Sequence, residues 1–329
     1  MVLREAGPDM KILIIGASGF IGKNTLLRLP KKHDITATYY KKDEGLSEFL
    51  KENELDNVTS FRVDLTNINS IKKMFNKIDG HVDTALYLAA NRNLSDSITN
   101  PLFDLEANVK GMINFLECFK GSRLIFFSSG AVYDGLVGAV SPEIKINPKL
   151  PFAITKLTSE QYIKFYQQRR KNIEDYIIVR FFGAYGPYEL ERKIHTKLIE
   201  TFYFKNERSF TIRGDGKNFI DSMYVDDAVE GILRMIESEN SNMVVDFCVG
   251  SPLKIDQLVG NVAKIVGQND IKIRHEGKTE EPIKFFASPD LFKHTFNFKP
   301  KISLDEGIGK FIKFLEGKHD TYSKTNNGK

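Results

Sequence analysis

Short runs of β-branched and other apolar residues alternate, through the first half of the chain, with segments whose apolar residues recur at helical spacing. The runs predict strands at 11–16, 35–40, 58–64, 83–90, 123–129 and 176–182. The segments between them predict helices at 20–29, 68–78, 104–119 and 154–170. Strands that are apolar on both faces are typical of a parallel sheet covered by helices on both sides. We therefore expect an α/β fold with a doubly wound, Rossmann-type sheet.

The pattern changes after residue 182 to shorter pieces punctuated by Gly and Pro, with helices expected at 226–237 and 254–266 and a strand near 244–249. The glycine-rich segment GASGFIG at 16–22 is typical of a dinucleotide-binding loop. We therefore expect a dinucleotide-binding domain at 10–182 and a smaller, mainly substrate-binding part at 183–316, in which the chain crosses back to the sheet. The polar end at 317–329 is expected to be loose. Ligands of open α/β sheets bind at the carboxyl ends of the strands, where the second part would cover the first.

Composition excludes several classes of protein. The 329 residues are 41% hydrophobic and 27% charged, and no apolar run approaches the ~20 residues of a membrane span. The net charge is +4 with the signs interspersed, which gives no basic stripe for nucleic acid. Cys118 and Cys248 are far apart and the six histidines are scattered, so neither a disulfide framework nor a metal site is predicted. These features indicate a cytoplasmic protein without membrane or nucleic-acid partners.

Gly16, Gly19 and Gly22 extend from the end of the first predicted strand into the start of the first predicted helix. This spacing is typical of a loop that binds the pyrophosphate of a dinucleotide, with a structural turn as the alternative. The second strand is followed by Lys41 and Lys42, where an acidic residue would hold the ribose of NAD. Two cations there favour NADP over NAD, unless they belong to an ordinary solvated loop.

Several motifs follow the glycine loop in a fixed order, and together they give the chain a resemblance to a known family. They are GASGFIG (16–22), VDL (63–65), LAA (88–90), NVKG (108–111), SSGAVY (128–133), KLTSE (156–160), RFFGAYGP (180–187), GDG (214–216) and YVDD (224–227). Over residues 11–315 the chain resembles the extended short-chain dehydrogenase/reductases, the nucleotide-sugar epimerases, dehydratases and reductases.

The resemblance implies site residues, and also a homodimer in which the helices at about 104–119 and 152–170 pair into a four-helix interface. In the family a Ser, a Tyr and a Lys surround the nicotinamide, and Ser129 and Lys156 match two of them. The implied cofactor residues are Gly16, Ser18, Gly19, Phe20, Ile21, Gly22, Tyr39, Lys41, Lys42, Asp64, Leu65, Leu88, Ala89, Ala90, Asn108 and Lys156. The implied substrate residues are Ser129, Tyr133, Gly183, Arg213 and Ile220.

Phe152 stands four residues before Lys156, where the family has its proton-transferring Tyr. A phenyl ring cannot transfer a proton, and loss of a general acid/base typically slows a reaction by ~10²- to 10⁴-fold. Three explanations are open. Phe152 could be an engineered Tyr→Phe change, the enzyme could use another acid such as Tyr133 or a water, or the protein could have lost its chemistry and kept binding.

Other departures concern the substrate. Gly183 and Ile220 stand where the family often has Asn and Arg, which removes two donors for a diphosphate, although Arg213, Lys217 or Lys284 could substitute. No acid follows the serines of SSGAVY, which disfavours a dehydratase. We expect a 4-epimerase or 4-keto reductase acting on a nucleotide sugar for surface-polysaccharide precursors, with a non-catalytic dinucleotide-binding protein or sensor as the rival. His195, near the substrate segment, is expected to be an exposed helical residue.

Overall fold

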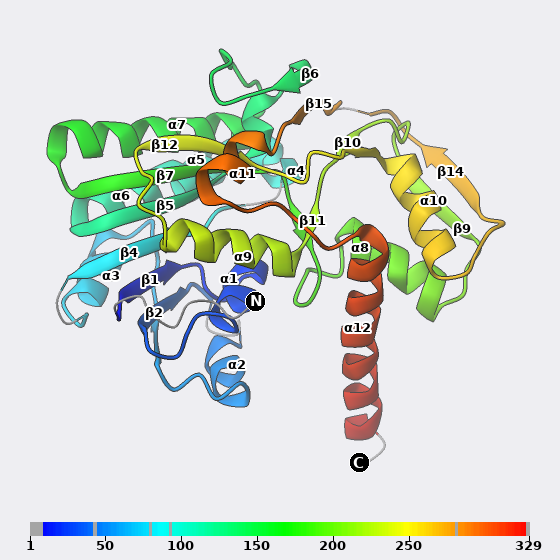
Figure 1. The fold of residues 1–329 in the computed structure, drawn as a ribbon, viewed down its shortest axis with the longest axis horizontal. Coiled ribbons are helices and arrows are strands. Elements are labelled where there is room, and N and C mark those ends of the chain that lie inside the picture. The colour runs from blue at the N-terminus through cyan, green and yellow to red at the C-terminus, as the bar shows by residue number, and fades with distance from the viewer. Residues whose placement is uncertain (1–8, 42–44, 79–80, 92–93, 280–281, 327–329) are drawn as a thin grey trace.

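The computed structural model describes residues 9–41, 45–78, 81–91, 94–279 and 282–326, with side chains described as far as residue 319. A seven-stranded parallel sheet forms its centre, with the strand order β12-β7-β5-β4-β1-β2-β3 (Figure 1). The strands are β1 (Lys11–Ile15), β2 (Asp34–Tyr39), β3 (Val58–Arg62), β4 (Val82–Tyr87), β5 (Gly121–Ser129), β7 (Ile173–Phe181) and β12 (Met243–Phe247). The predicted doubly wound α/β fold is confirmed.

Each face of this sheet is buried under helices, as the uninterrupted apolar strands predict. In β1, Ile12 and Ile14 belong to one hydrophobic cluster, whereas Leu13 and Ile15 belong to the other. The first cluster includes side chains of α1 (Phe20–Leu26), α2 (Leu46–Glu52) and α9 (Val225–Ile236). The second includes side chains of α3 (Ile68–Phe75), α6 (Gly111–Cys118) and α7 (Pro151–Phe165).

The strand expected near 244–249 is the sheet's seventh strand. β12 pairs in parallel with β7, and this register places Asp246 opposite Arg180. Ser128 of β5 is opposite the same arginine on the other side of β7. Three polar residues therefore lie in one row across neighbouring strands of an otherwise apolar sheet.

The remainder of the chain after β7 adds short elements beside the carboxyl ends of the strands (Figure 1). Short strands pair there: β8 (Ala184–Tyr185) with β11 (Met223–Tyr224), β9 (Ser209–Arg213) with β14 (Lys272–Glu276), and β10 (Phe219–Ile220) with β13 (Leu253–Lys254). β6 (Val137–Val140) pairs with β15 (Lys284–Ala287), and the helices are α8 (Ile194–Ile199), α10 (Ile255–Ile265) and α11 (Asp290–Phe296). The proposed division into two parts at residue 182 stays a prediction.

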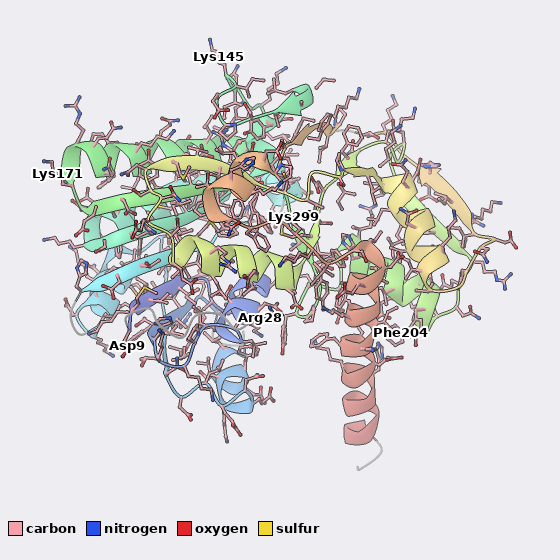
Figure 2. The ribbon with its side chains drawn as sticks, in the orientation of Figure 1. Asp9, Arg28, Lys145, Lys171, Phe204 and Lys299 are labelled. Atoms are coloured by element: carbon pink, nitrogen blue, oxygen red, sulfur yellow. The ribbon has the colours of Figure 1, made fainter. Side chains whose placement is uncertain are left out.

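The last helix, α12 (Leu304–Asn326), continues through most of the segment that we expected to be loose from residue 317. Contacts with the π-helical segment η4 (Glu200–Phe204) explain why helical structure persists there. The Tyr203 hydroxyl donates to Glu316 at 2.6 Å, and the His319 ring lies 4.3 Å from the ring of Phe204, which Figure 2 labels beside this helix. A composition rich in small polar residues did not reveal these partners.

The helix predicted at 104–119 is divided into α5 (Pro101–Leu105), the π-helical turn η1 (Glu106–Lys110) and α6. It is preceded by α4 (Leu94–Thr99), and α7 likewise ends in a π-helical turn, η3 (Tyr166–Arg170). π-Helical turns are rare and often occur near functional sites. None of the helices in the described residues combines the length and the apolar character needed to cross a membrane.

Candidate active site

The glycine loop connects β1 to α1 and lies against the end of β4. Gly16 has a φ of +87°, and a Cβ atom there would come within 2.9 Å of the Ala89 backbone. A Cβ at Gly22 would come within 2.6 Å of the Ala17 backbone. The amides of Leu88 and Ala89 both donate to the Ile15 carbonyl, at 2.9 and 3.0 Å. The structure thus brings together the predicted cofactor segments 16–22 and 88–90.

The loop fits a dinucleotide pyrophosphate. Gly19 is the N-cap of α1 and supplies no side chain, so the backbone of the first turn is open to an approaching ligand. The first amides of a helix have no intrahelical acceptors, and the helix dipole favours an anion at this end. Ser18, Phe20 and Ile21, predicted as cofactor residues, lie in or beside this turn.

The residues predicted to contact the adenosine half of the cofactor differ in their exposure and in their hydrogen bonds. Tyr39 ends β2 and is half-buried, whereas Lys41 is exposed and Lys42 lies outside the described residues. Asp64 follows β3 and accepts hydrogen bonds from the amide and hydroxyl of Thr66, at 2.9 and 2.7 Å. The Leu65 carbonyl accepts from Asn114 at 2.9 Å. Their roles in cofactor binding stay predictions.

Lys156 is buried at the carboxyl end of β5, with 3% of its surface exposed. Its Nζ donates to the Phe127 carbonyl at 2.5 Å and lies 4.1 Å from the centre of the Phe126 ring. Burial lowers the pKa of Lys156 to about 7, against the opposing effects of the Glu160 and Asp104 charges. A buried lysine with a displaced pKa in this position is a functional-site candidate.

Ser129 lies on β5 and Phe152 on α7, the two elements that the hydrogen bond from Lys156 to Phe127 connects. Ser129 ends β5, is half-buried, and accepts a hydrogen bond from the Ala131 amide at 3.1 Å. Phe152 is the second residue of α7 and is buried. Among the described residues it belongs to none of the three buried hydrophobic clusters. This position suits a ring that borders the site better than one that fills the core.

Tyr133, proposed as an alternative acid, is fully buried in η2 (Gly130–Tyr133). Its hydroxyl donates to Asp246 at 2.8 Å and accepts from Arg180 at 3.0 Å. Burial and the neighbouring Asp246 raise the pKa of Tyr133 well above its usual value. A hydroxyl that is engaged by these two partners is a poor proton donor to a substrate, so this version of the second explanation for Phe152 is disfavoured.

Arg180 joins this tyrosine to a buried ion pair. It donates to both carboxylate oxygens of Glu160, at 3.2 and 2.9 Å, and Ser128 donates to Glu160 at 2.5 Å. The sequence motifs gave no individual role to Arg180, Glu160 or Asp246. The available signal was a charged residue inside each of two apolar strand runs, YIIVRFF and VVDFCVG, because such residues are buried only with partners.

Asp246 should make the stability of the chain depend on pH. Burial raises the pKa of Asp246 to about 7 from the usual 3.8. The folded state therefore binds this proton more tightly than the unfolded state, and stability falls as pH rises from about 4 to about 7. Asp246→Asn keeps an acceptor for Tyr133 and should remove this component. Urea denaturation of both proteins across that range tests it, and parallel pH profiles would contradict it.

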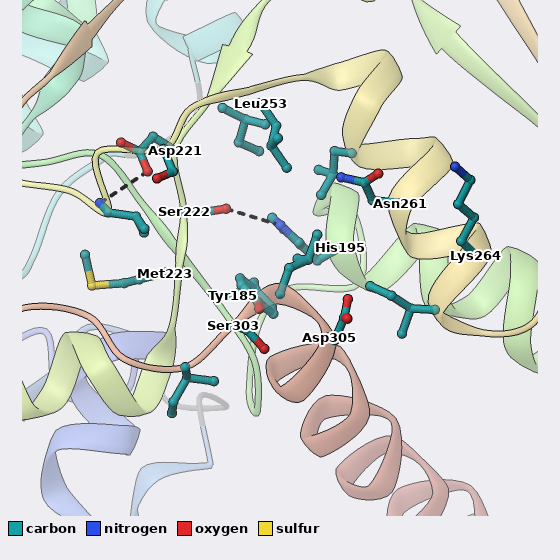
Figure 3. Close-up of a pocket in the computed structure, with 17 residues that line it drawn as sticks. Tyr185, His195, Asp221, Ser222, Met223, Leu253, Asn261, Lys264, Ser303 and Asp305 are labelled. Atoms are coloured by element: carbon teal, nitrogen blue, oxygen red, sulfur yellow. Dashed lines mark hydrogen bonds between the residues drawn. The ribbon is translucent and has the colours of Figure 1, made fainter.

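A cavity of about 650 Å³ lies between α8, α10 and the start of α12 (Figure 3). Its walls combine apolar side chains such as Leu253 with polar groups, including Ser222, Asn261 and Asp305. Ile220, predicted to contact the substrate, lines this cavity, but Ser129, Tyr133, Gly183 and Arg213 do not. Phe152 and Lys156, the predicted catalytic positions, do not line the cavity either.

His195 lines the same cavity, and our expectation of an exposed histidine is wrong. Its ring is buried, stacks on Tyr185 at 4.3 Å and lies 3.2 Å from the Ser222 hydroxyl (Figure 3). Burial lowers the pKa of His195 to about 3, which leaves a neutral ring. The described part of the chain holds no group of three or more His, Cys, Asp and Glu side chains arranged to bind a metal ion.

A model of the NAD dependent epimerase/dehydratase family matches residues 12–250, most of the chain and all of the motifs around the glycine loop and Lys156. The chain belongs to this family. The predicted relationship to the extended short-chain dehydrogenase/reductases is thereby confirmed. The residues around the glycine loop and Lys156 thus lie within the part of the chain that matches an NAD dependent family.

Named relatives and solved structures agree with the family. A UDP-glucuronate 4-epimerase of Thermodesulfobacterium geofontis is 25% identical, with 91% of this chain and 94% of the relative covered. A putative UDP-glucose 4-epimerase of Methanocaldococcus jannaschii is 27% identical, with coverage of 94% and 100%. The structure of a Thermotoga maritima UDP-glucose 4-epimerase with UDP-glucose superposes with a TM-score of 0.83, 22% identity and coverage of 94% and 99%.

A further similar structure is a Tyr→Phe mutant of a Bacillus cereus UDP-glucuronic acid 4-epimerase, in complex with NAD and a fluorinated UDP-sugar. It superposes with a TM-score of 0.82 and 23% identity, and 94% of this chain and 99% of that chain are covered. At these identities the two structures establish the shared fold alone.

Proposed function

We propose that this chain is an NAD-dependent nucleotide-sugar 4-epimerase, with 4-keto reduction as the alternative reaction. The observation that supports the proposal is the buried Lys156, which donates to the Phe127 carbonyl two residues before Ser129 at the end of β5. The glycine loop follows β1 of the same sheet. Relatives named as UDP-sugar 4-epimerases support it. A place in the cytoplasmic synthesis of surface-polysaccharide precursors is part of the same proposal.

In this proposal Ser129, Lys156 and the residue at position 152 have separate roles in the reaction. When bound, NAD accepts and returns the hydride of the sugar carbon. Ser129 donates a hydrogen bond to the sugar oxygen, and Lys156 holds the nicotinamide ribose. The hydroxyl missing from Phe152 would exchange the sugar's proton, so the present chain should bind both ligands and react slowly. The Tyr→Phe mutant of the Bacillus cereus epimerase bound NAD and a UDP-sugar analogue, which supports retained binding.

The direct test is conversion of UDP-glucose and UDP-glucuronic acid. Each would be incubated with NAD and the chain, for hours, and its C4 epimer would be measured by chromatography or NMR. A slow but NAD-dependent yield of the 4-epimer is expected. In a parallel incubation with NADH and a UDP-4-keto sugar, reduction of the ketone by the NADH hydride, without epimer formation in the first incubation, would favour the reductase. Binding of NAD with no conversion, even after Phe152→Tyr, would favour the non-catalytic rival.

We propose NAD rather than NADP as the cofactor, against our expectation from Lys41 and Lys42. The family is described as NAD dependent, and several similar structures contain NAD. Calorimetric titration should give the tighter dissociation constant for NAD, and changing both lysines to Ala should leave it nearly unchanged. Tighter NADP binding that is lost in the double variant would restore the original prediction, because those cations would then contact the 2′-phosphate.

We also propose a homodimer formed through α5 and α7. Large apolar side chains are exposed on both helices, among them Leu102 at 66% and Phe165 at 47%. Exposed large apolar side chains gathered on neighbouring helices favour an interaction surface. Light scattering should give twice 37.5 kDa for the unaltered chain. Leu102→Glu combined with Phe165→Glu should give a folded monomer, whereas an unaltered chain of 37.5 kDa at micromolar concentration would contradict the proposal.

A further inference from the structure

A second buried carboxylate, on the helix before the π-helical turn, is hydrogen-bonded to the residue that precedes Lys156. Asp104 of α5 is fully buried, with 0% of its surface exposed. Its carboxylate accepts three side-chain hydrogen bonds, from Thr155 at 2.6 Å, Asn91 at 2.9 Å and Asn108 at 3.0 Å. Asp104 therefore connects the end of β4, the turn η1 and the catalytic helix α7.

All three donors lie beside predicted cofactor or catalytic residues. Asn91 directly follows Ala90, Asn108 is itself a predicted cofactor residue, and Thr155 directly precedes Lys156. The Asn91 amide also donates to the Asn108 side chain at 2.8 Å. A shift of Asp104 would thus move several parts of the site together.

A buried ammonium such as that of Lys156 is stabilised by negative charge nearby. The charges of two carboxylates favour this ammonium, first Glu160 from its own helix and then Asp104 from α5. Glu160 is already bound to Arg180, at 2.9 Å, and accepts from Ser128. No ion pair involving Asp104 is found in the part of the chain that the structure describes. Glu160 thus divides its charge between Arg180 and Lys156, and the charge of Asp104 adds to that of Glu160 in favouring the ammonium of the buried lysine.

We propose that Asp104 is a positioning residue that keeps Lys156 in its ammonium form and fixes Asn91, Asn108 and α7 around the nicotinamide end of the cofactor. The role of Lys156 toward the cofactor rests on the proposed function, but its charge does not. Burial of an ammonium disfavours the charged form, and a nearby opposite charge restores it. Removal of Asp104's charge should therefore lower the pH at which Lys156 loses its proton.

The experiment titrates Lys156 directly, without cofactor. The ¹³Cε signals of labelled lysines would be followed by NMR against pH, and Lys156→Met would assign the signal by its loss. Asp104→Asn and Asp104→Ser both remove the charge, but they differ in shape and hydrogen-bonding groups. The control is Asp227→Asn, which removes a buried carboxylate that accepts backbone hydrogen bonds at 2.9 and 2.8 Å near α12.

Both Asp104 variants should move the midpoint of the Lys156 titration to a pH lower by ~1, while the control leaves it in place. Near-ultraviolet circular dichroism would show that each variant is folded. An unchanged midpoint in a folded Asp104→Asn or Asp104→Ser protein would overturn the inference and leave Asp104 a merely structural residue. So would an equal change in Asp227→Asn, because the effect would then be nonspecific.

Cofactor affinity provides a second readout. The dissociation constant for NAD should begin to rise at lower pH in Asp104→Asn than in the unaltered chain, and at a given pH the two constants should differ by up to ~10-fold. If Asp104→Asn weakened NAD binding by the same factor at every pH, Asp104 would not act through the charge of Lys156. If the Lys156 midpoint moves as expected but the Phe152→Tyr protein converts no nucleotide sugar, the proposed function fails and this inference stands.

Discussion

Replacement of Phe152 by Tyr should raise turnover of the correct nucleotide sugar by ~10²-fold or more. The change adds one hydroxyl four residues before Lys156, on the same face of α7, without adding much volume. The ammonium of Lys156 would favour the ionised phenol and so suit it to proton transfer near neutral pH. Single-turnover absorbance of the nicotinamide, with and without the substitution, measures the effect.

The control for this prediction is Phe204→Tyr, which adds the same hydroxyl on η4, near α12 and remote from Lys156. It should leave turnover unchanged, and neither substitution should alter NAD affinity greatly. Ordinary enzyme rates in the unaltered chain, or no gain in the Phe152→Tyr protein, would mean that another group transfers the proton. Tyr133 is a poor candidate for that group because Asp246 and Arg180 engage its hydroxyl.

Glu160→Gln should reduce the free energy of unfolding by about 3–5 kcal/mol, the usual cost of breaking a buried ion pair. The substitution removes the charge that faces Arg180, which would then be buried without an adequate counter-charge. Urea denaturation followed by circular dichroism measures the loss. The control is Glu106→Gln, whose exposed pair with Lys110 spans 3.3 Å and should contribute ~0.5 kcal/mol or less.

A double substitution tests the physical reason for the Glu160 effect. Removal of both charges, in Glu160→Gln with Arg180→Met, should leave a protein more stable than Glu160→Gln alone, since no unpaired charge is then buried. A single variant that loses less than about 1 kcal/mol would show that water or Asp246 satisfies Arg180 without Glu160.

The central sheet was predictable because its signal is local. Each of the seven predicted strands is present within a few residues of its expected limits, since apolar strands buried on both faces form continuous runs in the sequence. The small strands β9, β10, β13 and β14 gave no such signal. They are only two to five residues long, and each pairs with a distant partner, so their pattern arises from tertiary contacts.

The candidate site was predictable where a motif fixes a backbone shape or a helical face. The glycine loop follows from the close approach to Ala89 and Ala17, and Lys156 follows from its spacing to Phe152. The carboxylates around Lys156 were not found. Asp104 and Glu160 acquire their roles from neighbours distant in the sequence, Asn91 and Arg180 among them. In the sequence alone, a buried acidic residue of a helix cannot be distinguished from an exposed one.

The π-helical turn η1 places a limit on how this segment of the chain can change in length. A π-helical turn is the usual result of one residue inserted into an α-helix, and successive residues of an α-helix are about 100° apart around its axis. Deletion of one residue between Leu105 and Asn108 would allow α5 and α6 to join as an unbroken helix. Asn108 would then turn away from Asp104 and Thr155, and its carbonyl would lose the Ser159 hydroxyl that lies 3.1 Å from it. Descendants of this chain can therefore vary the residue types within η1 more readily than they can vary its number of residues.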